Sequence, residues 1–208
     1  MPRSQQGLIR LLRRQGVDER VVQAFAEVAR VDFVPQDAGP IAYADRPVSI
    51  PEGQTTSQPS LIARMVEAAA PTPSGRVLEV GTGFGFQTAL LARLAGEVFS
   101  IERFEVLAEA ARRNLDRAGI ENARVIVGDG WKGIPQHQPF DAIVVSAAAE
   151  EVPRALEEQL AEGGRMVIPV KGPLSDDVLV FVKQGGRVTK HSLLTPARFV
   201  PLVREGKP

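Results

Sequence analysis

The feature that most constrains the fold is a repeated alternation of short apolar segments with helical segments. Five apolar segments that are typical of strands lie at residues 76–80, 97–101, 123–127, 140–145 and 165–169. Helical patterns lie between them at residues 86–95, 104–118 and 153–160. Strands that are apolar throughout and alternate with helices indicate a parallel sheet covered on both faces. We therefore predict an α/β fold with a doubly wound, mostly parallel sheet.

The pattern changes near the end of the chain. Residues 178–183 and 187–194 both read as strands, and only Gln184-Gly185-Gly186 separates them. A connection that short leaves no room for a helix, so the two strands must be antiparallel. We expect this hairpin to complete the sheet.

The first 70 residues follow a different plan. They predict helices at 4–16, after Asp18, and from Pro59 to residue 70, because Asp favours the N-cap and Pro the first helical position. Pro and Gly are dense between residues 31 and 58, which predicts an irregular functional loop. We expect residues 1–70 to form N-terminal helices and a substrate loop, packed on a core of residues 71–208 as one compact domain.

A glycine-rich loop, Gly81-Thr82-Gly83-Phe84-Gly85, follows the first predicted strand of this core. Glycine allows positive φ and a close approach of the main chain to a ligand, and ligands of doubly wound sheets bind at this end of the strands. The spacing G-x-G-x-G differs from the G-x-G-x-x-G of dinucleotide-binding proteins, and no Lys-Ser/Thr pair follows for a triphosphate. By itself such a loop could also be only a tight turn.

Three acidic residues fall at the predicted ends of successive strands. They are Glu79, Glu102 and Asp129. Glu102 is placed to accept the two hydroxyls of a ribose, and Asp129, between two glycines, to face an adenine edge. Carboxylates around a site without phosphate contacts favour a positively charged nucleoside, and S-adenosylmethionine meets that description. The alternative is that these acids are solvated surface residues.

Composition excludes several other classes. The chain of 208 residues has 25 Lys and Arg against 25 Asp and Glu, so it lacks the basic footprint of a nucleic-acid-binding protein. No run approaches the ~20 apolar residues of a membrane span. The absence of cysteine removes thiolate metal sites and suits a reducing compartment. We expect a cytoplasmic monomer without nucleic-acid or membrane partners.

Several motifs resemble those of the protein-L-isoaspartate O-methyltransferases. They are Gln-Thr-Thr-Ser-Gln-Pro at 54–59, Val-Leu-Glu-Val-Gly-Thr-Gly at 77–83, Gly-Asp-Gly at 128–130 and Phe-Val-Pro-Leu at 199–202. The glycine loop is shared by many class I methyltransferases, whereas the first and last motifs are far more specific. The resemblance implies methyl transfer from S-adenosylmethionine to the free carboxylate of L-isoaspartyl residues in damaged proteins. The ester of that family then closes to a succinimide, which begins repair.

The expected site contains one catalytic residue, Ser57, and no metal. The expected cofactor-binding residues are Thr56, Glu79, Gly81, Thr82, Gly83, Glu102, Asp129 and Gly130. A substrate carboxylate with a pKa near ~4 needs no general base, so we expect His137 and His191 to be surface residues. Ser57 would hold one carboxylate oxygen while the other attacks, and it could instead, or in addition, cap the helix that begins at Pro59.

Two departures from the family pattern are visible. Gly85-Phe86-Gln87 replaces a common Gly-Tyr pair followed by a small or polar residue, and Ser60 stands where an aromatic residue or His is frequent. Other functions compatible with the pattern are a small-molecule carboxylate methyltransferase and a catalytically silent cofactor-binding module.

Overall fold

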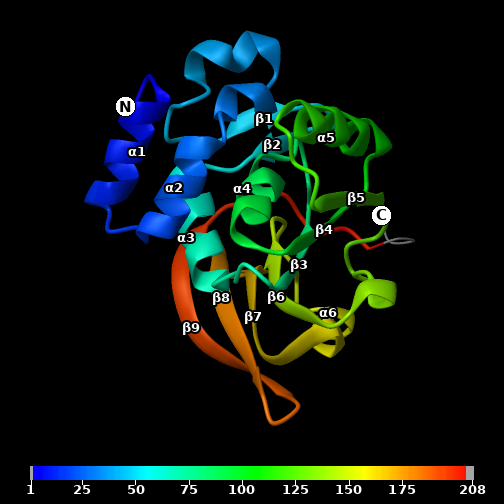
Figure 1. Cartoon of the computed structure of the whole chain (residues 1–208). Coiled ribbons are helices and arrows are strands. Elements are labelled where there is room, and N and C mark those ends of the chain that lie inside the picture. Colours follow the sequence, from blue (N-terminus) through cyan, green and yellow to red (C-terminus); the bar gives the residue numbers. More distant parts are fainter. Residues whose placement is uncertain (1, 205–208) are drawn as a thin grey trace.

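A sheet of seven strands forms the centre of the molecule in a computed structural model, which describes residues 2–204 (Figure 1). Its strands are β3 (Arg76–Val80), β4 (Glu97–Glu102), β5 (Ala123–Val127), β6 (Phe140–Val145), β7 (Leu160–Lys171), β8 (Asp176–Gln184) and β9 (Arg187–Ala197). The order is β5-β4-β3-β6-β7-β8-β9, in which β3 to β7 are parallel and β8 and β9 antiparallel. The predicted doubly wound sheet with a terminal hairpin is confirmed.

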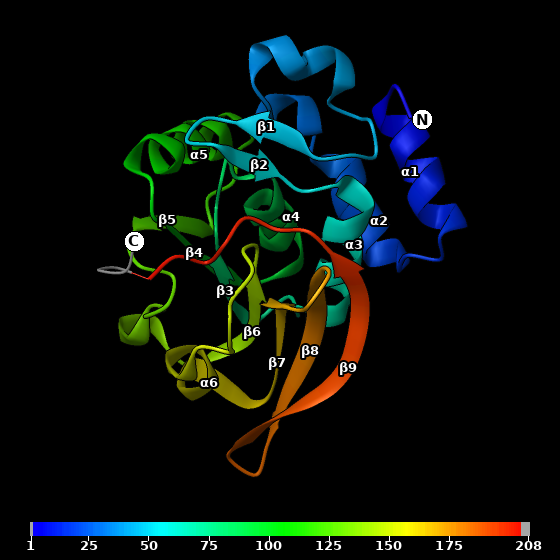
Figure 2. The ribbon, with the colours of Figure 1, turned by 180° about the vertical axis from the view of Figure 1, so that it is seen from behind.

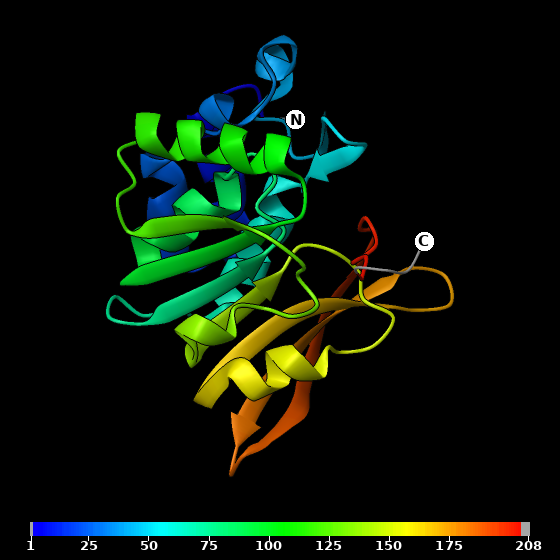
Figure 3. The same cartoon turned by 90° about the vertical axis from the view of Figure 1, so that its right-hand side faces the viewer.

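Helices cover both faces of the sheet. They are α1 (Gln5–Arg14), α2 (Glu19–Glu27), α3 (Pro59–Ala69), α4 (Phe86–Leu94), α5 (Glu105–Arg117) and α6 (Arg154–Gln159), with 3-10 turns η1 (Arg30–Phe33), η2 (Gln36–Ile41) and η3 (Pro135–His137). Figure 3 shows α5 and α6 on opposite faces. Because side chains alternate along a strand, Val77 joins the apolar cluster under α1 to α4, whereas Leu78 joins the cluster that contains Leu156 of α6.

The predicted helix boundaries are close to the observed ones, and the main difference lies in the start of β7. Asp18 caps α2, since its carboxylate accepts the Arg20 N–H at 2.8 Å. The segment expected as a helix to 160 and a strand from 165 instead changes to β7 at Leu160. Leu160 pairs with Phe140 on β6, and after a register shift the pairing resumes between Arg165 and Ala142, so the glycines lie in an irregular stretch within β7 rather than before it.

The segment 31–58 is more ordered than the sequence predicts. Besides η1 and η2 it contains a two-stranded antiparallel sheet of β1 (Val48–Ile50) and β2 (Gln54–Thr56). Glu52 and Gly53 form the turn with φ of 60° and 65°. Hairpin turns of this kind favour Asn-Gly or Asp-Gly, so Glu-Gly gives little signal in the sequence.

The N-terminal and C-terminal segments both pack on the core. Phe25 and Phe33 contact the ring of Phe86, with centroids 5.6 and 5.9 Å away. Figure 2 shows the C-terminal segment crossing in front of the sheet from the end of β9. Trp131 holds it there, because its indole N–H donates to the Leu202 carbonyl at 3.0 Å. Within residues 2–204, no helix is both long enough and apolar enough to cross a membrane.

Candidate active site

The glycine loop lies between β3 and α4 and has the backbone conformation that the sequence predicts. Gly81 and Gly83 have φ of 93° and 56°, values that other residues rarely adopt. Both also sit in close contact: a Cβ at Gly81 would lie 3.3 Å from Ser146, and one at Gly83 would lie 3.3 Å from Ile50. The loop therefore presents main chain at the carboxyl ends of the parallel strands.

Glu79 lies behind this loop, with none of its surface exposed. Its carboxylate accepts hydrogen bonds from Ser100 (2.6 Å), Gln87 (3.0 Å) and Thr88. Thr82 also points inward, to the hydroxyl of Ser100. Burial raises the pKa of Glu79 from 4.5 to about 7, although the three hydrogen bonds oppose the shift. The side chains of Glu79 and Thr82 thus meet protein partners behind the loop.

Gln87 extends this buried network toward the surface of the site. Its amide donates to both Glu79 (3.0 Å) and the hydroxyl of Ser146 (2.9 Å), the residue that follows β6. Ser146 in turn donates its N–H to the Val80 carbonyl at 2.8 Å. The chain therefore uses the unusual Gln87 to connect the ends of β3 and β6.

Glu102, at the end of β4, occupies the neighbouring position on the same edge. Its two carboxylate oxygens accept the N–H groups of Gly83 (2.9 Å) and Phe104 (3.1 Å). A carboxylate can accept about four hydrogen bonds, so capacity remains for a hydroxyl ligand. Glu102 thus fixes the glycine loop and has oxygens that could bind a ribose.

Asp129 and Gly130 complete the edge after β5. The Asp129 carboxylate accepts the Trp131 N–H at 2.9 Å and lies 3.9 Å from the Lys132 amine. At Gly130 the main chain passes so close to Val80 that a Cβ would clash with it. Since β5, β4 and β3 are neighbours and parallel, Asp129, Glu102 and the glycine loop lie along one edge.

The N-terminal segment covers the glycine loop. Thr55, Thr56 and Ser57 line a cavity of about 30 Å³ together with residues of the loop and Ser146. That volume is about the share of one water molecule in the liquid. The N-terminal segment therefore lies close over the glycine loop.

A second cavity, of about 370 Å³, opens on the other side of Ser57. It lies between the N-terminal segment, the start of α3 and the C-terminal segment 195–200. Thr55, Ser57 and Ser146 line both cavities, so they form the boundary between them. Ser57 is therefore placed between the glycine loop and the larger cavity.

Asp45, rather than Ser57, caps α3. Its carboxylate accepts the Ser60 N–H at 2.9 Å and the Gln58 amide at 3.1 Å. The Gln58 amide also donates to the hydroxyl of Ser60 at 2.9 Å. Ser60, which departs from the family pattern, is buried. The N-cap residue is Gln58, whose side chain does not cap the helix, and within residues 2–204 the Ser57 hydroxyl makes no hydrogen bond to it. The prediction that Ser57 caps α3 is therefore wrong.

Arg30, in the interior of the molecule, holds the backbone of Ser57 in place. This arginine is fully buried, and its guanidinium donates to the carbonyls of Ser57 (3.0 Å), Ala42 (2.7 Å) and Ala44 (3.2 Å). It also lies 5.6 Å from the ring centre of Phe86, at the start of α4. Burial lowers its pKa to about 10, partly offset by the charge of Asp45. One side chain thus connects the N-terminal segment to the helix that follows the glycine loop.

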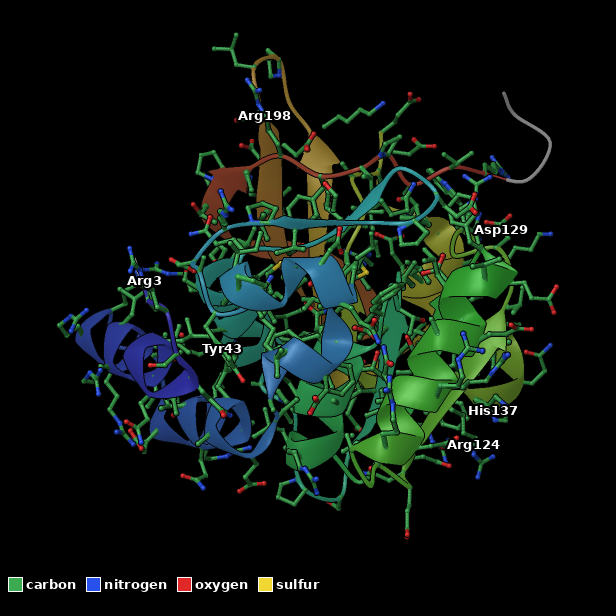
Figure 4. All side chains as sticks on the ribbon, turned by 90° about the horizontal axis from the view of Figure 1, so that it is seen from above. Arg3, Tyr43, Arg124, Asp129, His137 and Arg198 are labelled. Atoms are coloured by element: carbon green, nitrogen blue, oxygen red, sulfur yellow. The ribbon has the colours of Figure 1, made fainter. Side chains whose placement is uncertain are left out.

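Neither histidine lies near this site. His137 stacks on Phe99, with ring centroids 4.2 Å apart, and Arg76 at the start of β3 donates to its carbonyl at 3.0 Å. It is therefore at the amino ends of the strands, and Figure 4 shows it beside Arg124, away from Arg198. His191 is exposed on β9. We conclude that no imidazole is available as a general base at the glycine loop.

The sequence did not identify Arg30, Asp45, Gln87 or Ser146 as parts of the site. Arg30 and Asp45 lie in the stretches 30–35 and 42–45, which also resemble the family, but both act through main-chain groups that are distant in sequence, so the resemblance did not indicate their roles. Gln87 stood out only as a departure from a family pattern, which was the one available signal.

Comparison with known proteins agrees with this geometry. The model of the protein-L-isoaspartate(D-aspartate) O-methyltransferase family matches residues 3–207. A protein-L-isoaspartate O-methyltransferase of Koribacter versatilis is 51% identical over 193 residues, which are 92% of this chain and 86% of that protein. One from Methanoculleus marisnigri is 47% identical, over 92% and 87% of the two chains.

Solved structures agree as well. A protein-L-isoaspartate O-methyltransferase structure superposes with a TM-score of 0.85 at 31% identity, over 95% of this chain and 65% of that one. A Plasmodium falciparum protein of the same description, in complex with S-adenosyl-L-homocysteine, gives a TM-score of 0.84 at 27% identity over 97% and 99% of the chains. The chain belongs to the protein-L-isoaspartate(D-aspartate) O-methyltransferase family.

Proposed function

We propose that the chain transfers a methyl group from S-adenosylmethionine to the free carboxylate of L-isoaspartyl residues in proteins and peptides. The observation that carries this proposal is the position of Ser57 between two features. On one side lies the glycine loop with Glu102, and on the other a cavity of about 370 Å³. Membership of the family supports the reaction, and this geometry supports separate sites for donor and acceptor on the two sides of Ser57.

The cofactor would occupy the edge formed by the ends of β3, β4 and β5, and it supplies an activated methyl group there. Glu102 would accept the ribose hydroxyls, and Asp129 with Gly130 would face the adenine. The main chain of Gly81 and Gly83 would lie against the ligand, with Thr56 closing over it. We propose supporting roles for Glu79 and Thr82, because both side chains bond to protein groups behind the loop.

The acceptor needs alignment rather than deprotonation. A carboxylate with a pKa near ~4 is ionised at neutral pH, so an in-line attack requires no base. The Ser57 hydroxyl would donate to one oxygen and leave the other free to attack. Holding the reactants in line and excluding water from the carboxylate are the contributions expected of the protein.

The test is transfer of labelled methyl groups to an isoaspartyl peptide and to its aspartyl twin. Ser57→Ala should lower kcat about 10- to 100-fold, as expected for loss of a hydrogen bond to a charged group, and leave cofactor affinity unchanged. Ser49→Ala on the exposed face of β1 is the matched control, with unchanged kcat.

Each other outcome has a clear meaning. Unaltered kcat in Ser57→Ala at saturating peptide would remove Ser57 from the site. Equal methylation of both peptides, or better methylation of free small acids, would favour a small-molecule carboxylate methyltransferase. Cofactor binding with no turnover on any acceptor would favour a silent binding module.

We also propose that the protein acts as a cytoplasmic monomer that does not bind nucleic acid. The equal numbers of acidic and basic residues and the absence of cysteine support this proposal. Light scattering of the purified protein, with and without DNA or RNA, would contradict it by showing a dimer or a complex.

A further inference from the structure

The larger cavity has an unbalanced charge. Among residues 2–204, its charged lining residues are Arg64, on α3, and Arg198, in the segment after β9, and no Asp or Glu of this range lines it. Both arginines are exposed. The cavity that would receive the acceptor therefore carries two positive charges, although the whole chain has a formal net charge of zero.

Neither guanidinium is used elsewhere in the part of the chain that the structure describes. No ion pair or side-chain hydrogen bond joins Arg64 or Arg198 to another residue there, whereas other surface arginines are paired, such as Arg13 with Glu19 and Arg154 with Glu158. The two arginines are thus available to a ligand of the cavity.

Acids on the same or adjoining elements already have other partners. Glu67, three residues after Arg64 on α3, accepts the Asp18 N–H at 2.7 Å. Asp45 binds the Ser60 N–H and the Gln58 amide at the start of α3. Asp176, at the start of β8, accepts the Phe199 N–H at 2.8 Å, beside Arg198 in the chain. None of these three acids lines the cavity.

We infer that this cavity selects isoaspartyl segments that carry acidic side chains next to the isoaspartyl residue, which Arg64 and Arg198 bind. The inference rests on the proposed function and adds a substrate preference to it. Complementary charge raises the association rate and discriminates between otherwise equal ligands. Arginine presents a planar set of donors that matches a carboxylate.

The reacting carboxylate is present in every substrate, so the preference must be measured at flanking positions. Two isoaspartyl peptides are compared that differ only in Glu or Gln on both sides of the isoaspartyl residue. At low ionic strength we expect kcat/KM to be about tenfold higher for the Glu peptide, because an exposed ion pair contributes about two- to fivefold. Added salt should reduce the ratio, since exposed charges are screened.

Variants assign the effect to the two residues. Arg64→Gln and Arg198→Gln should each lower the Glu/Gln ratio about two- to fivefold, and the double variant should abolish the preference. Arg187→Gln is the matched control: it is exposed at the other end of β9, about 30 Å along the strand, and should leave the ratio unchanged. Cofactor affinity, measured in parallel, reports whether each variant is folded.

The outcomes separate this inference from the proposed function. Equal kcat/KM for the two peptides, or a preference that survives in the double variant, would overturn the inference. A double variant that lowers kcat/KM for both peptides by the same factor would also overturn it. The arginines would then affect the shape of the cavity without discriminating between charged and uncharged peptides. Failure to methylate either peptide would instead contradict the proposed function.

Discussion

The two sides of the site are built in different ways. On the cofactor side, acids and glycines follow three successive strands, and hydrogen bonds between neighbouring strand ends, such as Gly83 to Glu102, fix them. On the acceptor side, the cavity is formed by the segments 55–64 and 195–200, which lie far apart in the chain and carry exposed arginines. The first side is set by the sheet, whereas the second depends on how the terminal segments pack against it.

Arg30 is the physical connection between the two sides. It binds the carbonyl of Ser57 on the acceptor side and lies against Phe86 at the start of α4 on the cofactor side. The carbonyls that it binds all belong to residues 1–70, and its contact with Phe86 places it at the boundary with the rest of the chain. We propose that the two segments fold as one domain, and the three changes below test how far the two sides are independent.

The largest effect is expected from Arg30→Met. The variant should lose about 3–5 kcal/mol of unfolding free energy, because several buried carbonyls lose a donor at about 1–3 kcal/mol each. Urea unfolding followed by the fluorescence of Trp131 tests this and the single-domain proposal together, since Trp131 lies outside the N-terminal segment. Arg154→Met, whose parent side chain is 88% exposed, should change little. A loss below about 1 kcal/mol, or an unchanged Trp131 transition, would show that the segments are only loosely coupled.

The next effect concerns Glu79 and pH. Its pKa is raised from 4.5 to about 7 in the folded chain, so the folded state binds the proton more tightly than the unfolded state. The tighter proton binding adds to the free energy of unfolding below pH 4.5, and this contribution is lost as the pH rises to about 7. The total loss is up to about 3 kcal/mol.

Glu79→Gln removes this titration. The stability of the variant relative to the parent should therefore increase between pH 5 and pH 8, as measured by urea unfolding at each pH. Glu121→Gln, at an exposed position before β5, should follow the parent curve. Parallel curves for the parent and Glu79→Gln would show that the buried carboxyl keeps its ordinary pKa.

The smallest of the three effects is expected from Glu102→Gln, which tests the cofactor side alone. Calorimetry should show about 10- to 100-fold weaker binding of S-adenosylmethionine, because hydrogen bonds to a charged acceptor are replaced by weaker ones. The Glu/Gln peptide preference should stay the same. A variant that binds cofactor normally, or that loses the peptide preference, would contradict the division between the two sides.

The predictable parts of the structure share one property: each depends on residues close in sequence. The bounds of β3, β5 and β6 agree with the apolar segments, and Asp18 caps α2 as its position before a helix indicates. The expected start of β7 at residue 165 was wrong, because Leu160 already pairs with Phe140 on β6 before the irregular stretch that contains the glycines. The β1–β2 hairpin was missed for a similar reason, as its turn carries no Asn-Gly or Asp-Gly signal.

Within the candidate site, the sequence predicted the positions of residues along the strands better than the directions in which their side chains point. It placed Glu79 and Glu102 at neighbouring strand ends, and both are there. It could not show that Glu79 points into the core toward Ser100 and Thr88, since that depends on which face of the sheet α4 covers. Nor could it show that Asp45, thirteen residues before Gln58, would replace Ser57 as the cap of α3.

By itself, the order of apolar segments, glycines and acids determined the parallel sheet and the edge where a nucleoside can bind. These follow from local conformational preference and from strand polarity, which a linear pattern contains. Only the tertiary structure decided that Arg30 would bind the Ser57 carbonyl and that Arg64 and Arg198 would line one cavity in which no acid of residues 2–204 takes part. Those arrangements depend on packing between distant segments, because a buried or unpaired charge is defined by its neighbours in space rather than in sequence.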